Sequence, residues 1–268
     1  MSGPAVSVLM AVRDGAPWVA EAVASVLGQT AGDLELIVID DGSTDATPEL
    51  LAEVRDERLR VDRRSATGLT PSLNRALALA RAPLVARLDA DDLALPERLA
   101  RQRDYLAAHP DVGLLGGGVR EQDADGREVA VRVPPVADAQ LRAALIRRNP
   151  FVHSAVMVRR ALVEQVGGYD ESVPVAQDYD LWMRLARVTR LASLPEVVVV
   201  RRLLPGRISS VRDAARLRAE ARIRWRAVRA GGSPWWCAVY ALRPAAALAL
   251  PLPLRRRVRH ALGGATGA

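Results

Sequence analysis

Aspartate residues gather in three short runs of this sequence, at Asp14, at Asp40 to Asp45 and at Asp89 to Asp92. In the last run Asp89 and Asp91 are one residue apart, so an extended backbone points both carboxylates to the same side. Such a pair suits a hard divalent cation, Mg²⁺ or Mn²⁺, that keeps several waters and also binds substrate phosphates. The alternative interpretation is a solvated turn followed by a helix N-cap.

Each run follows a short apolar stretch, and such stretches alternate with helical patterns between residues 5 and 110. This alternation predicts a parallel sheet covered by helices. Strands are expected at 6–12, 34–39, 59–62 and 84–88, and Pro96 opens an expected helix at 96–109. Ligands of open α/β sheets bind at the carboxyl ends of the strands, so we expect five of the aspartates to converge there. They would repel one another unless a divalent cation or hydrogen-bond donors occupied the cluster.

Beyond residue 110 the pattern becomes mixed, and it predicts an α/β fold with a mixed, mostly parallel, Rossmann-like sheet. Strands are expected at 112–119, 129–133, 154–158 and 197–200, and helices at 138–147 and 177–188. We assign residues 1–205 to a catalytic domain and residues 206–268 to a basic, partly apolar, helical C-terminal extension.

The helix expected at 177–188 carries a candidate general base, Asp178. The apolar residues that share its helix face are Leu181, Trp182 and Leu185. Asp180 is expected on the outward face, where it can pair with Arg184 four residues later. A partly desolvated carboxylate has a raised pKa, as a general base needs. The alternative is that Asp178 only stabilises the helix N-terminus through the helix dipole.

Two further features are candidates for the acceptor side of a site. His153 stands alone in an apolar segment, and both a direct role and a hydrogen-bonded structural role stay open for it. Gly117 lies in a run of three glycines, 116–118, that no helix follows. We interpret these glycines as a close approach of the backbone to a ligand, rather than as a phosphate-binding loop.

Composition excludes several reaction classes. All 38 basic side chains of the 268-residue chain are arginine. The lack of lysine excludes a P-loop lysine, a Schiff base and a kinase-type strand lysine. Cys237 is the single cysteine, which excludes an internal disulfide and a cysteine-based zinc site and favours a reducing, cytoplasmic location. The first residues have neither the basic region nor the cleavage site of a signal peptide.

Charge divides the chain into an acidic body and a basic tail. Residues 1–200 carry 23 Arg against 29 Asp and Glu, a balance of −6, whereas residues 201–268 carry 15 Arg against two acidic residues, a balance of +13. A nucleic-acid binder would spread its arginines over the body, so nucleic acid is not an expected partner. The tail is expected either to pack on the body or to bind peripherally to the anionic inner face of the cell membrane.

The tail contains an expected helix and an apolar segment. Ser210 and Asp213 form a capping box, and Gly231 ends the helix. The residues expected on its apolar stripe are Ala214, Leu217, Ala221, Trp225 and Val228. The apolar segment at 235–254 is long enough to cross a bilayer, but its arginine and prolines favour an interfacial position.

Six short motifs are distributed along residues 5–200. They are Val6-Ser7-Val8, Ser25 to Thr30, Asp40 to Asp45, Asp89 to Asp92 with Pro96 to Leu99, Gly167 to Glu171, and Gln177 to Trp182. In type and order they resemble the motifs of family 2 glycosyltransferases, which have the A-type nucleotide-sugar transferase fold.

The resemblance implies roles on the donor side. Asp40 would accept the ring N–H of the nucleotide base, a donor that uracil, thymine and guanine have and that adenine and cytosine lack. Ala11 and Arg13 would lie near the base and ribose. Asp89 would hold the ribose, and Asp91 would be the direct ligand of the diphosphate-bound Mg²⁺ or Mn²⁺.

On the acceptor side, the resemblance implies that Asp178 is the catalytic base and that the segment around His153 lies near the acceptor. The expected activity is a metal-dependent, inverting transfer of a sugar from a UDP- or dTDP-linked donor to a hydroxyl of a saccharide or lipid-linked saccharide. Polysaccharide biosynthesis at the cell envelope is the expected setting. Processive synthases of the same broad family carry a Gln-x-x-Arg-Trp motif, and here Ala221 replaces its glutamine, so a non-processive enzyme is expected.

Two alternatives to this activity are open. A nucleotidyltransferase on a related sheet needs a basic loop for a triphosphate, and the first loop has only Arg13. A catalytically silent protein that binds nucleotide sugars would be expected to have lost Asp91 or Asp178, and the chain has both.

Overall fold

The protein is described here by a computed structural model. The structure describes residues 3–204, 213–229, 239–240 and 242. The chain forms two compact units, Met1–Pro205 and Gly206–Ala268, and each is treated by itself. That the first unit is a catalytic domain and the second a membrane-associating extension stays a prediction.

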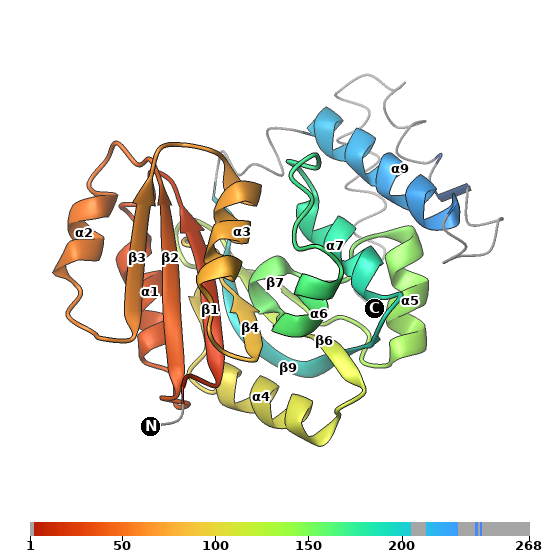
Figure 1. Cartoon of the computed structure of the whole chain (residues 1–268), viewed down its shortest axis with the longest axis horizontal. Helices are drawn as coiled ribbons and strands as arrows, with labels where there is room; N and C mark the ends of the chain where they lie inside the picture. The colour runs from red at the N-terminus through yellow and green to blue at the C-terminus, as the bar shows by residue number, and fades with distance from the viewer. Residues whose placement is uncertain (1–2, 205–212, 230–238, 241, 243–268) are drawn as a thin grey trace. The chain divides into compact units, whose positions relative to one another are not determined.

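The first half of the larger unit is a parallel sheet with helical crossovers (Figure 1). Its strands are β1 (Val6–Val12), β2 (Leu34–Asp41), β3 (Leu59–Arg64) and β4 (Leu84–Arg87). Its helices are α1 (Val19–Leu27), α2 (Thr47–Glu53) and α3 (Leu69–Leu79). The strands lie in the order β3-β2-β1-β4 and all run parallel, so their carboxyl ends meet at one edge.

The second half extends the same sheet with mixed directions. Its strands are β5 (Leu93–Ala94), β6 (Val112–Gln122), β7 (Glu128–Arg132), β8 (Met157–Arg159) and β9 (Arg190–Arg202). Its helices are α4 (Arg98–Ala108), α5 (Asp138–Arg147), the 3₁₀ turn η1 (His153–Ala155), α6 (Arg160–Gln165) and α7 (Gln177–Leu185). The sheet continues β4-β8-β6-β9-β5, with β8 antiparallel to both neighbours and β9 parallel to β6. The mixed α/β fold expected from the sequence is confirmed.

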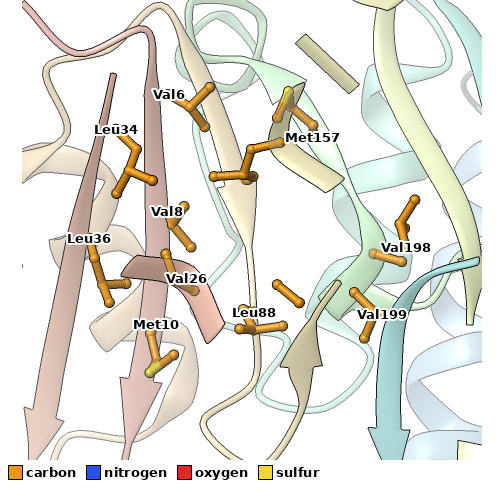
Figure 2. Close-up of a cluster of buried hydrophobic side chains, with 14 of the residues drawn as sticks. Val6, Val8, Met10, Val26, Leu34, Leu36, Leu88, Met157, Val198 and Val199 are labelled. Atoms are coloured by element: carbon orange, nitrogen blue, oxygen red, sulfur yellow. The ribbon is translucent and has the colours of Figure 1, made fainter. Parts of the chain in front are cut away.

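Side chains of successive strand residues point to opposite faces of the sheet, so a hydrophobic core forms on each face. Val6, Val8 and Met10 of β1 point to one face, where they pack with α1 side chains such as Val26 (Figure 2). The same cluster includes Leu99 and Leu106 of α4. Leu9 points to the opposite face, which α3 covers. Successive strand residues face opposite sides, so a buried sheet reads as continuously apolar. Burial of each such side chain contributes about 1.5–3 kcal/mol.

The expected elements of the first half are all present, and the differences lie in the second. β9 begins at Arg190 rather than at 197, because it pairs with β6 through irregular register shifts that no simple alternation reveals. The strand expected at 154–158 begins instead as η1 and becomes β8 only at Met157. The two-residue β5 and the six-residue α6 were too short to produce a periodic signal.

The glycine run at 116–118 is part of strand β6, and its interpretation as a close approach to a ligand is corrected. A Cβ added to Gly117 would lie 2.4 Å from a methyl of Val198 on β9. A Cβ on Gly116 would lie 2.5 Å from the ring of Phe151, and one on Gly118 would lie 2.9 Å from a backbone oxygen of β9. The glycines are therefore required by packing inside the protein, and a place for Gly117 on the acceptor side stays a prediction.

The smaller unit contains helix α9 (Asp213–Arg229). Its expected apolar stripe is correct in part: Ala214, Leu217, Ala221 and Val228 are half-buried, but Trp225 is 46% exposed, and Ile223 and Arg224 are buried instead. Glu220 pairs with Arg216 and Arg224, one turn before and after it, which explains why Arg224 can be buried. The expected cap residues Ser210 and Gly231, and most of the apolar segment at 235–254, lie outside the described residues. None of the helices in the described ranges is long and apolar enough to cross a membrane.

Gly117→Ala tests the packing role of this glycine. The added methyl must displace Val198, and overpacking of this kind costs about 1–3 kcal/mol. For a domain of this size each kcal/mol lowers Tm by about 2–4 °C, which differential scanning calorimetry resolves. Gly32→Ala is the control, because a Cβ there meets nothing within 4 Å. Equal Tm values for both variants would contradict the packing role.

Candidate active site

Three carboxylates meet in the turn after β4. Ligand oxygens of Asp89, Asp91 and Asp92 all lie within 4.8 Å of one another. Asp92 is fully buried, whereas Asp89 and Asp91 are partly exposed, so a cation from solvent can reach the latter two. Hard carboxylate oxygens at this spacing fit Mg²⁺ or Mn²⁺. The residues present therefore fit the metal site that the sequence predicts.

The aspartates lie at the carboxyl-end edge of the sheet, as expected, and those of the other loops are satisfied by backbone amides rather than by a cation. Asp41 accepts hydrogen bonds from the backbone N–H groups of Thr67 and Gly68, at 2.7 and 2.9 Å. Asp45 accepts one from the N–H of Ala16, at 3.0 Å. Asp14 has a left-handed backbone, φ 52°, and accepts one from the N–H of Thr44, at 2.7 Å. Asp14 and Asp45 fix the first two loops against one another, and Asp41 fixes the end of β2 to the loop before α3.

A buried hydroxyl holds the acidic cluster together. Ser154 Oγ of η1 lies 2.5 Å from an oxygen of Asp92 and 3.0 Å from an oxygen of Asp89, and it also accepts the backbone N–H of Asp89 at 3.1 Å. A hydroxyl has a single hydrogen, so Ser154 can donate to only one of the two carboxylates at a time. Its position fixes where both carboxylates lie.

Two buried arginines balance the charge beneath this cluster. Arg87, 2% exposed at the end of β4, forms an ion pair with Asp89. Burial disfavours the Arg87 charge, but this pair more than compensates and raises its pKa. Arg98 of α4 donates to the backbone oxygens of Arg87 and Val156, at 2.8 and 3.1 Å. Burial, and then the neighbouring charge of Arg87, lower the Arg98 pKa to about 9.

The residues predicted to bind the nucleotide lie at the carboxyl ends of neighbouring strands. Val12 pairs with Asp40 in the register of β1 and β2, which places Ala11 and Arg13 beside this position. Asp40 Oδ1 accepts the backbone N–H of Ser43 at 2.9 Å, and Oδ2 lies 3.4 Å from Arg63 Nε. Within the described part of the chain, Oδ2 is buried and accepts no hydrogen bond. A buried carboxylate oxygen without a donor is costly and can be satisfied by the N–H of a ligand.

The predicted base, Asp178, begins helix α7. Asn149 Nδ2 donates to Asp178 Oδ2 at 2.8 Å. Burial raises the Asp178 pKa, against the lowering effect of the Tyr179 backbone N–H and of Asn149. The charges of Arg87 and Asp89 also act on Asp178, so the base and the acidic cluster belong to one electrostatic site. The direction of the shift agrees with a general base.

The ion pair of Asp180 with Arg184 was predicted correctly, but the exposure of Asp180 was not. Arg184 donates to Asp180 Oδ2 at 2.8 Å, as the spacing of four residues predicts. Asp180 is nevertheless 5% exposed rather than outward-facing. Arg184 also donates to the backbone oxygen of Val166 at 2.6 Å, so this ion pair is covered by the segment before α7.

His153 has the environment of a structural residue. Its Nε2 lies 2.9 Å from the hydroxyl of Tyr169, and its ring meets the rings of Tyr169 and Trp182 edge-on. Burial, followed by the nearby charge of Arg87, lowers the His153 pKa well below its ordinary value, so the ring is neutral at pH 7. This favours the hydrogen-bonded alternative over direct catalysis.

The sequence analysis assigned no role in the site to four residues that hold its carboxylates in place. They are Arg87, Arg98, Asn149 and Ser154. One signal was available, since Arg87 is a charged residue inside an otherwise apolar buried strand, which requires a partner. Ser154 directly follows His153, but a lone serine carries no periodic or spacing signal. Asn149 and Asp178 are 29 residues apart, and only the tertiary structure brings them together.

The fold is shared with known glycosyltransferases. The mannosyltransferase PcManGT from Pyrobaculum calidifontis, in complex with GDP-Man and Mn²⁺, superposes with a TM-score of 0.66 at 24% identity, over 99% of this chain and 81% of that one. TarS of S. aureus (residues 1–349), in complex with UDP-GlcNAc, gives a TM-score of 0.65 at 20% identity, over 81% of this chain and 66% of that one. The A-type fold that the motifs predict is confirmed.

Sequence comparison agrees. The putative glycosyltransferase EpsE of Bacillus subtilis (strain 168) is 32% identical over 189 residues, 68% of this chain and 67% of EpsE. The O-antigen biosynthesis glycosyltransferase WbnJ of Escherichia coli is 29% identical over 185 residues, 67% of this chain and 71% of WbnJ. The family described as Glycosyl transferase family 2 matches residues 7–167, and the chain belongs to this family. The match ends before α7, so the role of Asp178 rests on the resemblance of its motif and on its environment.

Asp178→Asn tests the raised pKa through stability. A carboxyl with a folded pKa above its unfolded value stabilises the protein only while protonated, and this contribution is lost as pH rises through the folded pKa. The neutral amide should therefore raise Tm at pH 7, and the gain should disappear as pH falls toward about 4, the unfolded value of Asp. Calorimetry of metal-free protein measures this. Asp104→Asn, at an exposed site on α4, is the control, and a pH-independent difference for Asp178→Asn would contradict the raised pKa.

Proposed function

We propose that this protein is an inverting glycosyltransferase that moves a sugar from a nucleotide-diphosphate donor to a hydroxyl of a saccharide or lipid-linked saccharide. The observation that carries this proposal is the pairing of two kinds of carboxylate in one site. Asp89 and Asp91 are accessible to a cation, and Asp178 has a raised pKa and responds to the charges of Arg87 and Asp89. Donor activation and acceptor activation thus have separate residues.

In this mechanism Asp178 removes the proton of the acceptor hydroxyl as that oxygen attacks the anomeric carbon. A single displacement inverts the configuration of that carbon. Asp91 would hold Mg²⁺ or Mn²⁺, which would offset the charge of the leaving diphosphate, and Asp89 would hold the ribose. Ser154 and Arg87 keep Asp89 in place, and Arg98 holds the backbone beneath it.

For the donor, we infer UDP or dTDP as the carrier, with GDP fitting the same hydrogen bond. Asp40 Oδ2 is the candidate acceptor for the ring N–H of uracil, thymine or guanine. The structural neighbours that bind UDP-GlcNAc and GDP-Man support this range of bases. Arg63 covers Asp40 with a side chain that is 61% exposed and can move aside for a base.

For the acceptor, the names of relatives such as WbnJ support a role in polysaccharide biosynthesis. The balance of +13 in residues 201–268 supports peripheral attachment to an anionic membrane, where a lipid-linked acceptor would lie. We therefore propose a cytoplasmic location, peripheral on the inner face of the membrane. A screen of nucleotide release from UDP-, dTDP- and GDP-sugars with candidate acceptors tests the proposed activity directly.

Asp91→Ala tests the metal site. We expect the Mn²⁺-dependent part of UDP, dTDP or GDP binding to weaken by at least about 10–100-fold, the cost of disturbing even an outer partner of a metal ligand. Titration calorimetry with and without Mn²⁺ measures the effect. Asp104→Ala, an exposed aspartate on α4, is the matched control. Unchanged affinity in Asp91→Ala would remove this residue from the metal site.

The two aspartates of α7 should separate catalysis from stability. Asp178→Asn is expected to lower kcat by about 10²–10⁴-fold, the contribution of a general base, with donor binding retained. Asp180→Asn leaves Arg184 without its charged partner and is expected to cost about 1–3 kcal/mol of stability, while the folded fraction keeps its activity. Steady-state rates normalised to folded protein decide between them. Equal losses of kcat would contradict the assignment of the base.

A further inference from the structure

The loop after α5 brings one amide side chain to the predicted base. Asn149 follows α5 by two residues, and its Nδ2 lies 2.8 Å from Asp178 Oδ2. The interaction joins two segments 29 residues apart. A neutral amide beside a buried carboxylate can either donate to it or clash with it, depending on which way the amide is turned.

The orientation of the Asn149 amide is fixed by a second contact. Its Oδ1 accepts the backbone N–H of Phe151 at 3.2 Å. A backbone N–H is only a donor, so the atom that faces it must be the oxygen, and the NH₂ group must face Asp178. Asn149 therefore donates to the carboxylate, and the reversed amide would lose both hydrogen bonds.

Packing holds this loop and α7 together on both sides of the contact. The buried ring of Phe151 meets Trp182 of α7 edge-on, with centroids 6.2 Å apart and an interplanar angle of 71°. On the other side, the hydroxyl of Tyr179 donates to the backbone oxygen of Leu145 at the end of α5. Asn149 thus lies on a braced loop rather than on a free one, as a side chain that positions another must.

We propose that Asn149 is a positioning residue for the base, donating to one oxygen of Asp178 so that the other oxygen is directed toward the acceptor hydroxyl. The inference rests on the proposed function, because it assumes that Asp178 removes the acceptor proton. A single donor to Oδ2 restrains rotation of the carboxyl group about its terminal bond. It also favours the charged form of the carboxylate over the protonated form.

Other charged and polar groups around Asp178 also affect its pKa. Arg87 favours the charged form and Asp89 disfavours it, both from the end of β4. The N–H of Tyr179 donates from α7 itself. The hydroxyl of Tyr169 has a raised pKa and His153 a lowered one, so both stay neutral at pH 7. Among these groups, Asn149 is the side chain whose donation can be removed without changing any charge.

The test compares Asn149→Ala and Asn149→Asp with the wild type across pH. The probe is release of UDP or GDP from UDP-GlcNAc, UDP-glucose or GDP-mannose to water with Mn²⁺, using the donor that the wild type turns over. For Asn149→Ala we expect kcat about tenfold lower, an unchanged KM for the donor, and an acid limb moved up by about one pH unit, because one pKa unit is a tenfold change in ionised base. Asn149→Asp places a second carboxylate there and should move the limb further in the same direction.

Asn74→Ala is the matched control. Asn74 is equally half-buried and makes three hydrogen bonds, to the backbone N–H and oxygen of Tyr169 and to Glu171, none of them to Asp178. Its loss should lower Tm without moving the acid limb. If Asn149→Ala behaves in the same way, Asn149 is only structural and the inference is overturned. If Asp178→Asn retains wild-type kcat, it is the proposed function that fails instead.

A second readout needs no substrate. Asp178→Asn should raise Tm at pH 7 more in the Asn149→Ala background than in the wild type, because the carboxylate has lost its donor and its charged form is less favoured. The gain should disappear at a pH of about 4 in both backgrounds, but the pH above which it stops growing should be higher in the Asn149→Ala background, because that limit follows the folded pKa. Equal gains in both backgrounds would show that the side chains are not coupled and would overturn the inference even if no donor were turned over.

Discussion

The structure depends on how three neighbouring carboxylates are stabilised in the turn after β4. One of them, Asp92, is fully buried, and the other two are only partly exposed. Buried charges are tolerated only when they are paired and hydrogen-bonded. Arg87 pairs with Asp89, and Ser154 lies between Asp89 and Asp92. Asp92 is buried among protein donors, which leaves Asp89 and Asp91 accessible from solvent. The same contacts that allow the turn to fold therefore determine which carboxylates can meet a cation.

The segment between α5 and β8 connects this cluster to the base. Its second residue, Asn149, contacts Asp178, and five residues later Ser154 contacts Asp89 and Asp92. The six residues 149–154 thus contact both the proposed base, Asp178, and the acidic cluster that would lie beside the leaving diphosphate. Catalysis by positioning requires such distances to be fixed before substrate binds. Sub-ångström precision is easier to achieve when one short, packed segment supports both sides.

The sequence predicted the parallel half of the fold because its strands are continuously apolar and its helices have clear periodicity. β9 was half missed because its pairing with the glycines of β6 is irregular, and the glycines themselves were misinterpreted because packing against Val198 leaves no mark in sequence. The stripe on α9 was correct only in part, because the i, i+4 pairing of Arg224 with Glu220 allowed an arginine to be buried. In each case a tertiary contact outweighed the local pattern.

Strand-end reasoning predicted Asp91, and the family resemblance, supported by the helix face, predicted Asp178. Neither could predict partners such as Ser154 and Asn149, which only the tertiary structure brings together. The central claim is that Asp91, in the turn shared with Asp89 and Asp92, holds a divalent cation within reach of the donor diphosphate. Anomalous diffraction at the manganese edge, from crystals grown with UDP and Mn²⁺, tests it most directly. The account predicts one anomalous peak at about 2.0–2.3 Å from a carboxylate oxygen of Asp91, bridging to the diphosphate. A nucleotide bound at Asp40 with no manganese peak near the turn after β4 would contradict it.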